Sequence, residues 1–273
     1  MSKKIDLHTH STYSDGTLSP AELVKVSHKH GAEALILSDH DSVSGCGEAA
    51  AEAAKRGLRF ACGVEINTRE SDVHVLGYGF AAFSAEFSKH LASFRGCREE
   101  RVRRILDKLH GLGVELTYEE VTRQVKESVG RPHVADALIR GKIVRSRREA
   151  FHKFLGQGAA AYVERLGPNI QEAIAAIRDA GGWAALAHPY TTPFEGRIES
   201  WVDAGLQGIE VYYMNHTRRQ IERLVEVARR YGLRMTGGSD FHGPRTGRDT
   251  PGPVEVADDV FAAIEDSLRL SEV

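Results

Sequence analysis

The sequence predicts an α/β fold: parallel strands and outer helices around one core, closed into a barrel and interrupted by a helical insertion. Short apolar segments, each followed by a helical pattern, recur along residues 4–78 and again along 183–268. Between about residues 87 and 166 the pattern is helical, without a convincing strand. Roughly seven strand–helix units in one core favour a barrel over an open sheet.

The first predicted helix has a clear start and end. Ser19 can cap it, Pro20 suits its first turn, Glu22 completes a capping box and Gly31 ends it. Before the insertion we predict strands at 4–7, 34–38, 60–66 and 73–78 and an alanine-rich helix at 45–56. After it we predict strands at 183–187, 208–211 and 234–237 and helices at 170–180, 217–231 and 257–268.

The helical stretch is predicted to be an insertion rather than an independent domain. Its longest helix is marked by apolar residues at helical spacing, and shorter helices are predicted at 132–139 and 150–155. The apolar residues of the long helix are Phe94, Val102, Ile105, Leu106 and Leu109. We therefore expect residues 1–86 and 168–273 to form the barrel, and residues 87–167 to form part of the substrate site.

Composition excludes several classes of protein. Hydrophobic residues make up 41% of the chain and charged residues 27%, as in ordinary globular proteins. No apolar run approaches the ~20 residues of a membrane helix, and no signal peptide is visible. The three cysteines, Cys46, Cys62 and Cys97, lack C-x-x-C spacing. We expect neither a disulfide framework nor a thiolate zinc site, and a cytoplasmic location.

Charge is unevenly distributed along the chain. Residues 95–153 contain fifteen Lys or Arg and nine Asp or Glu, although the net charge of the whole chain is −2. Such a basic block is commonly just a solvated helical face. It is equally compatible with a basic surface that meets an anionic substrate, while the acidic remainder holds cations.

Six of the thirteen histidines follow or lie within predicted strands, each near a carboxylate. Polar residues at the carboxyl ends of parallel strands meet at one edge of the fold. A lone histidine there is more often structural, but His8 and His10, two apart in an extended segment, can reach one ion. The candidate metal ligands are His8, His10, Asp15, His40, Glu65, His74, His188, Asp240 and His242.

Nine candidates exceed the need of a single ion, because a catalytic zinc uses about three protein ligands. Imidazole and carboxylate ligands without sulfur suit Mn²⁺, Fe²⁺ or Zn²⁺. The sequence therefore predicts two or three clustered divalent ions, which can activate water and stabilise charge during displacement at phosphorus.

These segments resemble the PHP family, named for polymerase and histidinol phosphatase domains. The resemblance covers the whole chain and rests on six segments in order. They are Asp6–His10 with Ser14–Gly16, Ser38–Asp41, Gly63–Ile66, His74–Tyr78, Ala187–Pro189 and Gly238–Gly243. The family fold is a distorted (β/α)7 barrel, resembling a TIM barrel, so the resemblance implies that fold here.

The resemblance also implies a division of the ligands. One ion would take His8, His10, Glu65 and Asp240. A second would take Asp15, His40 and His242. A third would take His74 and His188, with Glu65 bridging to the first. In the family a metal-bound hydroxide attacks a phosphoester, which implies catalytic roles for His40, Asp240 and His242.

Four further residues are candidate substrate contacts. Gly130–Ala135 resembles a segment in the insertion of PHP enzymes that act on nucleotides, so Arg131 could bind phosphate and His133 could bind phosphate or donate a proton. Both could equally be ordinary residues at a helix start. His216 resembles a substrate-facing histidine, and it could equally be a residue at the start of the following helix. Arg197 could replace an arginine that follows the His-Pro pair in bisphosphate phosphatases but not here.

The predicted activity is hydrolysis of a phosphate ester of a nucleotide or short oligonucleotide, by a 3',5'-nucleotide bisphosphate phosphatase or a 5'-3' exoribonuclease-like enzyme. We expect a phosphorylated small molecule, a nucleotide or short RNA as substrate, with no membrane and no obligate protein partner. One alternative is a histidinol-phosphate-type phosphatase. Another, from a different class, is a non-catalytic nucleic-acid-binding module.

Overall fold

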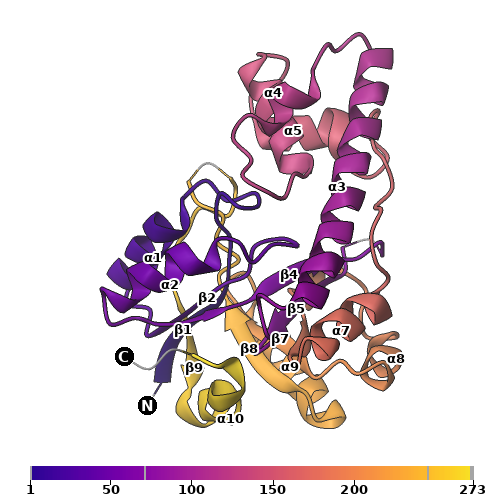
Figure 1. Cartoon of the computed structure of the whole chain (residues 1–273). Helices are drawn as coiled ribbons and strands as arrows, with labels where there is room; N and C mark the ends of the chain where they lie inside the picture. The colour runs from indigo at the N-terminus through magenta and orange to yellow at the C-terminus, as the bar shows by residue number, and fades with distance from the viewer. Residues whose placement is uncertain (1, 71, 245, 271–273) are drawn as a thin grey trace.

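The protein, seen here as a computed structural model that describes residues 2–70, 72–244 and 246–270, is built on two β-sheets (Figure 1). One has the strand order β3-β2-β1-β9 and the other β4-β5-β6-β7-β8. The first sheet consists of β1 (Ser2–Thr9), β2 (Ala34–Leu37), β3 (Arg59–Cys62) and β9 (Val254–Ala257). The second consists of β4 (Val64–Asn67), β5 (His74–Tyr78), β6 (Trp183–Leu186), β7 (Gly208–Tyr213) and β8 (Arg234–Gly238).

The expectation of an all-parallel arrangement is wrong at two strands. β1, β2 and β3 are mutually parallel, as are β6, β7 and β8. However, β5 runs antiparallel to both β4 and β6, and β9 runs antiparallel to β1. β4 and β5 are joined by a short connection, which permits only antiparallel pairing. The reversal places His74, the first residue of β5, at the edge where β6 ends.

The strand predicted over 60–66 is divided at Gly63, and its halves belong to different sheets. A Cβ at Gly63 would lie 2.4 Å from Cγ2 of Ile36, so only glycine fits where the chain crosses between the sheets. Two isolated parallel bridges, Thr9 with Phe241 and His40 with Glu65, connect the sheets. Within the described residues the strands thus form two sheets rather than one closed barrel, and these bridges link the sheets at the edge that carries the candidate metal ligands.

Helices cover the outer faces of the sheets, and the predicted capping box of Ser19 and Glu22 is confirmed. The helices outside the insertion are α1 (Pro20–Lys29), α2 (Cys46–Ala54), α7 (Ile170–Asp179), α8 (Ile198–Asp203), α9 (Arg218–Tyr231) and α10 (Asp258–Leu268). The others are α3 (Ala85–Gly111), α4 (Tyr118–Thr122), α5 (Arg131–Arg140) and α6 (Arg147–Ala150), followed by a π-helical turn at Phe151–Leu155.

The long helix α3 belongs to two hydrophobic cores. Its first turns bury Phe87 and Phe94 in the core around the sheets. Its later turns bury Val102 and Leu109 in a second core formed with α4 and α5. Figure 1 shows α3 rising from the sheets to this upper group of helices. The boundary between the two cores therefore falls within α3, and not at residue 87, where the insertion is predicted to begin.

The cysteines correct one expectation. Cys46 at the start of α2 and Cys62 at the end of β3 form a disulfide, with Cα atoms 5.5 Å apart. Their spacing along the sequence could not reveal that α2 packs its first turn against β3. The argument for a reducing compartment is weakened accordingly, and the cytoplasmic location stays a prediction. Separately, no helix within the described residues is long and apolar enough to cross a membrane.

Candidate metal centre and phosphate cavity

The candidate ligands lie together at one edge of the two sheets. Within the described residues, three groups have ligand atoms that all fall within 4.8 Å of one another. The first is His8, His10, Glu65 and Asp240; the second is His10, Asp15, His40 and His242; the third is Glu65, His74 and His188. The structure therefore brings all nine predicted residues together, in the division that the family resemblance implies, with His10 adjoining the second group as well.

The first group is fully buried. His8 Nε2 lies 3.2 Å from Glu65 Oε2 and 3.4 Å from Asp240 Oδ1. His10 Nε2 lies 3.2 Å and 3.3 Å from the same two oxygens. All four residues have no exposed surface. Two imidazole nitrogens and two carboxylate oxygens thus converge on one point in the interior.

Among the described residues, these four converging atoms have no hydrogen-bond partner. His8 Nε2, His10 Nε2, Glu65 Oε2 and Asp240 Oδ1 are all buried without such a partner, as is Asp15 Oδ1 of the second group. Leaving a buried polar atom unpaired costs about 1–3 kcal/mol. Buried unpaired atoms of ligand type that point at one another are explained by a cation between them, so these residues fit a divalent metal.

The second and third groups adjoin the first. Asp15 lies between two imidazoles, with His242 Nε2 at 3.1 Å and His40 Nε2 at 3.7 Å from its carboxylate. In the third group, Glu65 Oε1 lies 2.7 Å from His74 Nδ1 and 3.0 Å from His188 Nε2. Glu65 therefore serves the first group with one oxygen and the third with the other.

Hydrogen bonds on the outer side of the imidazoles fix their orientation. His8 Nδ1 is 3.1 Å from Glu210 Oε1, which leaves its Nε2 facing the first group. His242 Nδ1 is 2.7 Å from the backbone oxygen of Asp240, which leaves its Nε2 facing Asp15. Such outer partners set the tautomer of metal-binding histidines. Glu210 was not among the predicted site residues; its only sequence signal is an acidic residue inside the apolar strand β7.

Two buried aspartates, Asp6 and Asp39, hold the loops that carry candidate ligands and are not candidate ligands themselves. Asp6 accepts hydrogen bonds from the Ser239 backbone N–H (2.8 Å) and hydroxyl (2.7 Å), which fixes the turn before Asp240. Asp39 accepts from the backbone N–H and hydroxyl of Ser11 at 2.7 and 2.6 Å. It also accepts from the Ser14 hydroxyl at 2.6 Å. These bonds hold the loop between His10 and Asp15.

The backbone is strained at this edge. Asp41, His188 and Asp240 have φ values of 51°, 26° and 54°, in a region that non-glycine residues rarely adopt. All three directly follow or flank a strand end that contributes a candidate ligand. Such conformations persist where the surroundings fix them, and they cluster at functional sites.

Electrostatic interactions within the cluster are strong. Burial alone would lower the pKa of His10, but the carboxylates of Asp240 and Glu65 raise it to about 9. Burial alone would raise the pKa of Glu65, but His40 and His74 hold it well below its usual range. The buried carboxylates therefore require positive charge. Bound divalent ions would supply it in place of protons, because ligating imidazoles must be neutral.

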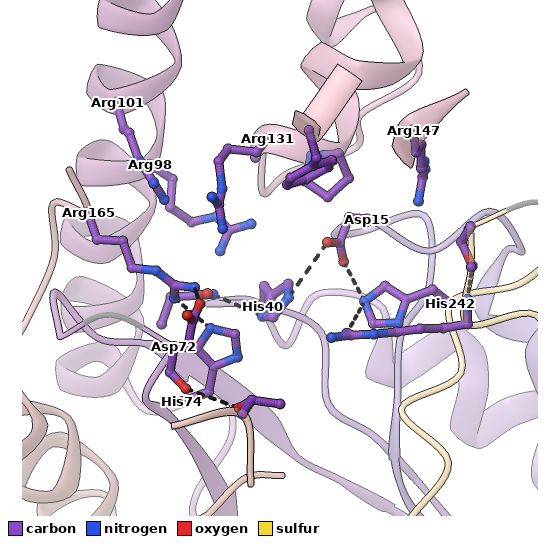
Figure 2. A pocket seen from close by; sticks show the side chains of 18 of the residues that line it. Asp15, His40, Asp72, His74, Arg98, Arg101, Arg131, Arg147, Arg165 and His242 are labelled. Carbon is purple, nitrogen blue, oxygen red and sulfur yellow. Dashed lines mark hydrogen bonds and ion pairs between the residues drawn. The ribbon is translucent and has the colours of Figure 1, made fainter. Parts of the chain in front are cut away.

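A cavity of about 650 Å³ opens beside the second and third groups, between the sheets and the insertion (Figure 2). Asp15, His40, His74, His188 and His242 line its floor. Among the described residues, seven arginines also line it: Arg98, Arg101, Arg131, Arg147, Arg148, Arg165 and Arg248. Of these, sequence reasoning identified only Arg131. Arginine forks suit phosphate oxygens, so the cavity matches an anionic ligand next to cations.

The predicted contacts on α5 have different positions. Arg131 lines the cavity, with its guanidinium 5.3 Å from the Phe151 ring. His133 does not line it: Nδ1 accepts a hydrogen bond from Gly130 N–H (3.0 Å), so Nε2 donates to the Ser14 carbonyl (2.9 Å). Neither nitrogen is free in this conformation to protonate a leaving group. His133 instead ties the insertion to the loop of Asp15.

The structure does not bring Arg197 or His216 to this cavity. The Arg197 guanidinium lies 4.8 Å from the Trp201 ring at the start of α8. His216 has Nδ1 2.9 Å from the Val211 carbonyl, and its ring contacts Tyr190 and Tyr213. The order of Arg197 after His188 predicts a place at the cavity that Arg197 does not take, because chain order does not determine which way a loop residue turns.

Known proteins resemble this chain over most of its length. The family model of the PHP domain matches residues 6–129. A 5'-3' exoribonuclease of Haemophilus influenzae is 35% identical over 89% of this chain and 92% of its own. A 3',5'-nucleoside bisphosphate phosphatase of Chromobacterium violaceum is 35% identical over 92% and 91%. A structure of an amidohydrolase from C. violaceum, with bound sulfate and no metal, has a TM-score of 0.88 at 32% identity, covering 98% of each chain. The chain belongs to the PHP domain family.

Proposed function

We propose that this protein is a metal-dependent phosphoesterase that hydrolyses a phosphate ester of a nucleotide or a short oligonucleotide. One observation carries the proposal: the three His/carboxylate groups lie beside a cavity lined by arginines. Cation sites and arginines around one cavity suit an anionic ester such as a phosphate ester. The names of the two relatives, an exoribonuclease and a nucleoside bisphosphate phosphatase, support a nucleotide substrate.

The three groups would hold two or three divalent ions of Mn²⁺, Fe²⁺ or Zn²⁺. The unpaired nitrogens of His8 and His10 support the first site, and the two oxygens of Glu65 support a bridge to the third. When bound, such ions lower the pKa of water and offset negative charge on phosphate oxygens. His40 and His242 border the cavity, whereas Asp240 acts from a fully buried position.

The insertion, residues 87–167, would contribute the phosphate-binding side chains. Arg131 and Arg165 face the floor of the cavity from this segment, and Arg147 does so from the opposite side, beside Asp15 (Figure 2). Their guanidinium groups would orient a phosphate ester toward His40 and His242. The bridges between the two sheets support a distorted barrel as the scaffold.

A phosphate-release assay in the presence of Mn²⁺ tests the proposal. The protein should release phosphate from adenosine 3',5'-bisphosphate, or shorten a 5'-phosphorylated oligoribonucleotide, faster than it acts on histidinol phosphate. Faster release from histidinol phosphate would support the alternative phosphatase. Tight RNA binding without turnover on any of these compounds would support a non-catalytic binding module.

A further inference from the structure

Hydrogen bonding distinguishes the third candidate metal group from the other two. Within the described residues, the first and second groups contain buried atoms without a hydrogen-bond partner, such as His10 Nε2 and Asp15 Oδ1. In the third group, His74 Nδ1 lies 2.7 Å and His188 Nε2 lies 3.0 Å from the same atom, Oε1 of Glu65. The third group therefore satisfies its own polar atoms, whereas the other two leave theirs facing one another.

An arginine of the insertion adds a further hydrogen bond to the third group. Arg165 Nη1 lies 2.6 Å from His74 Nε2, and Arg165 Nη2 lies 2.8 Å from Asp72 Oδ1. The Arg165 side chain is only 8% exposed and lines the cavity. Figure 2 shows it reaching toward Asp72 and His74. A nearly buried cation thus contacts the outer nitrogen of a candidate metal ligand.

The chemistry of arginine fixes the donor and acceptor roles at His74. A guanidinium has N–H donors and no acceptor, so His74 Nε2 accepts this hydrogen bond with its lone pair. The hydrogen of the neutral imidazole is then on Nδ1, which donates to Glu65 Oε1. Because a metal ion binds a free lone pair of a neutral imidazole, His74 has none to offer in this conformation.

Metal binding through either nitrogen of His74 conflicts with Arg165. Binding through Nε2 requires Arg165 to give up the lone pair that it holds. Binding through Nδ1 requires the hydrogen to move to Nε2, where it would face the N–H group of Arg165. In both cases the positive charge of Arg165 also repels a cation at this short range. Arg165 and a third ion therefore exclude each other at His74.

The cavity offers a way to remove this exclusion. Arg165 lines the same cavity as His40 and His242, so a phosphate group bound there would present oxygens to its guanidinium. Charge-assisted hydrogen bonds to phosphate are roughly twice as strong as those to a neutral acceptor such as the His74 imidazole. Movement of Arg165 from His74 to a phosphate would free the imidazole for metal binding.

We propose that Arg165 controls the third metal site: it excludes an ion while it holds His74, and it admits one when a phosphate group draws it away. The protein without substrate would then hold two ions tightly and a third only weakly. For the role of the phosphate group, the inference rests on the proposed phosphoesterase function. Binding of a phosphate and of the third ion would strengthen each other, because such coupling is reciprocal.

Mn²⁺ binding to the metal-stripped protein tests the inference, with free Mn²⁺ measured by electron paramagnetic resonance. For the wild type we expect two tight ions and a third that binds at least ~10-fold more weakly, the factor that a hydrogen bond from a charged donor contributes. Arg165→Met removes the donor and retains an extended side chain. It should tighten the third ion ~10-fold or more and leave the first two unchanged.

The matched control is Arg131→Met, which removes a cation from the same cavity without freeing His74, since Arg131 donates to the Leu155 carbonyl at 3.2 Å. Binding of the third ion should stay as in the wild type. Equal tightening in both variants would show that charge alone acts, and would overturn the inference. Three ions of equal affinity in the wild type would overturn it as well.

Nitrogen NMR of histidine-labelled wild type gives a readout that does not depend on the Arg165 variant. In the metal-stripped protein, the His74 ring should carry its hydrogen on Nδ1, with its signals identified by their loss in His74→Gln. A hydrogen on Nε2 would contradict the hydrogen bond from Arg165 and overturn the inference.

A titration with inorganic phosphate tests the coupling. Phosphate should tighten the third Mn²⁺ in the wild type more than in Arg165→Met, and an equal gain in both would overturn the role of phosphate in moving Arg165. None of these measurements involves turnover. A protein that met all of them but released no phosphate from any ester would therefore contradict the proposed function and not the control of the third site by Arg165.

Discussion

His10 Nε2 and Glu65 Oε2 lie 3.2 Å apart in the interior, and neither atom has a hydrogen-bond partner in the part of the chain that the structure describes. The same oxygen lies 3.2 Å from His8 Nε2, and the other oxygen of Glu65 lies 2.7 Å from His74 Nδ1. Glu65 thereby connects two of the three candidate metal groups. Metal binding in both of these groups therefore depends on this single side chain.

Glu65→Gln should remove metal from the first and third groups while the second is retained. The amide keeps the volume of the side chain but loses the charge that pairs with the imidazoles. Metal per chain after gel filtration, measured by ICP mass spectrometry, should fall, and phosphate release should fall ~100-fold or more. The control is Glu52→Gln, since Glu52 is also buried but lies on α2 among Lys55 and Arg56. Unchanged metal content in Glu65→Gln would contradict the bridge.

Glu210→Gln should weaken metal binding without removing a ligand. Glu210 accepts from His188 N–H at 2.7 Å and contacts His8 Nδ1 at 3.1 Å. An amide can keep the first contact but cannot hold His8 with the same charge. We expect metal affinity to drop about 10- to 100-fold, as for other outer partners of ligating histidines. Competition with a fluorescent chelator measures it, and an affinity equal to that of the wild type would exclude this role.

His133 should make the stability of the metal-free protein depend on pH. Burial, partly offset by Asp15, lowers its pKa, so the folded state binds fewer protons than the unfolded state at acid pH. The contribution of His133 to the free energy of unfolding is complete above the pKa of an unfolded histidine, about 6.5. It is lost as the pH falls below that value, by at most ~1.4 kcal/mol per pH unit. His133→Gln, which can still accept from Gly130 N–H, should flatten the dependence.

Urea unfolding at pH 7.5 and pH 5.5 measures this difference. Because other buried histidines also contribute to the pH dependence, the informative quantity is a difference. It is the change in unfolding free energy between the two pH values for the wild type, minus the same change for the variant. The same pH dependence in both proteins would show that His133 does not hold the insertion onto the Asp15 loop.

Leu109→Ala should destabilise the insertion without affecting metal binding. Leu109 is fully buried in the second core, and truncation of a buried leucine costs about 2–5 kcal/mol. We expect lower stability and a higher KM, with metal content unchanged, because none of the nine candidate ligands lies in the insertion. Leu112→Ala, at the exposed end of the same helix, is the control. Metal loss in Leu109→Ala comparable to that of Glu65→Gln would contradict the claim that metal binding does not depend on the insertion.

Part of the site could be read from the sequence for a physical reason. His8 lies near the end of β1 and His10 directly after it, two residues apart, and Asp240 and His242 repeat that spacing after β8, so the sequence predicts that each pair points to one side. The position of His74 could not be read in the same way, because it depends on β5 running antiparallel. His74 reaches the site from the start of its strand, not from the end.

The arginines were largely missed for a related reason. Arg98, Arg101 and Arg165 lie on elements without a motif. They meet at the cavity because the segment around Val163, which leads from the insertion back to α7, packs against α3. The same limit explains the disulfide between Cys46 and Cys62, which are 16 residues apart, and the turn of Arg197 toward Trp201. These contacts depend on tertiary packing, which the local sequence pattern does not predict.

Adding Mn²⁺ back to metal-stripped protein tests the central claim most directly. Phosphate release from adenosine 3',5'-bisphosphate would be followed as the ion is titrated in, with metal content measured on the same samples. The account predicts no release from stripped protein and full release once two or three ions are bound per chain. Full release at a metal content near zero would contradict it.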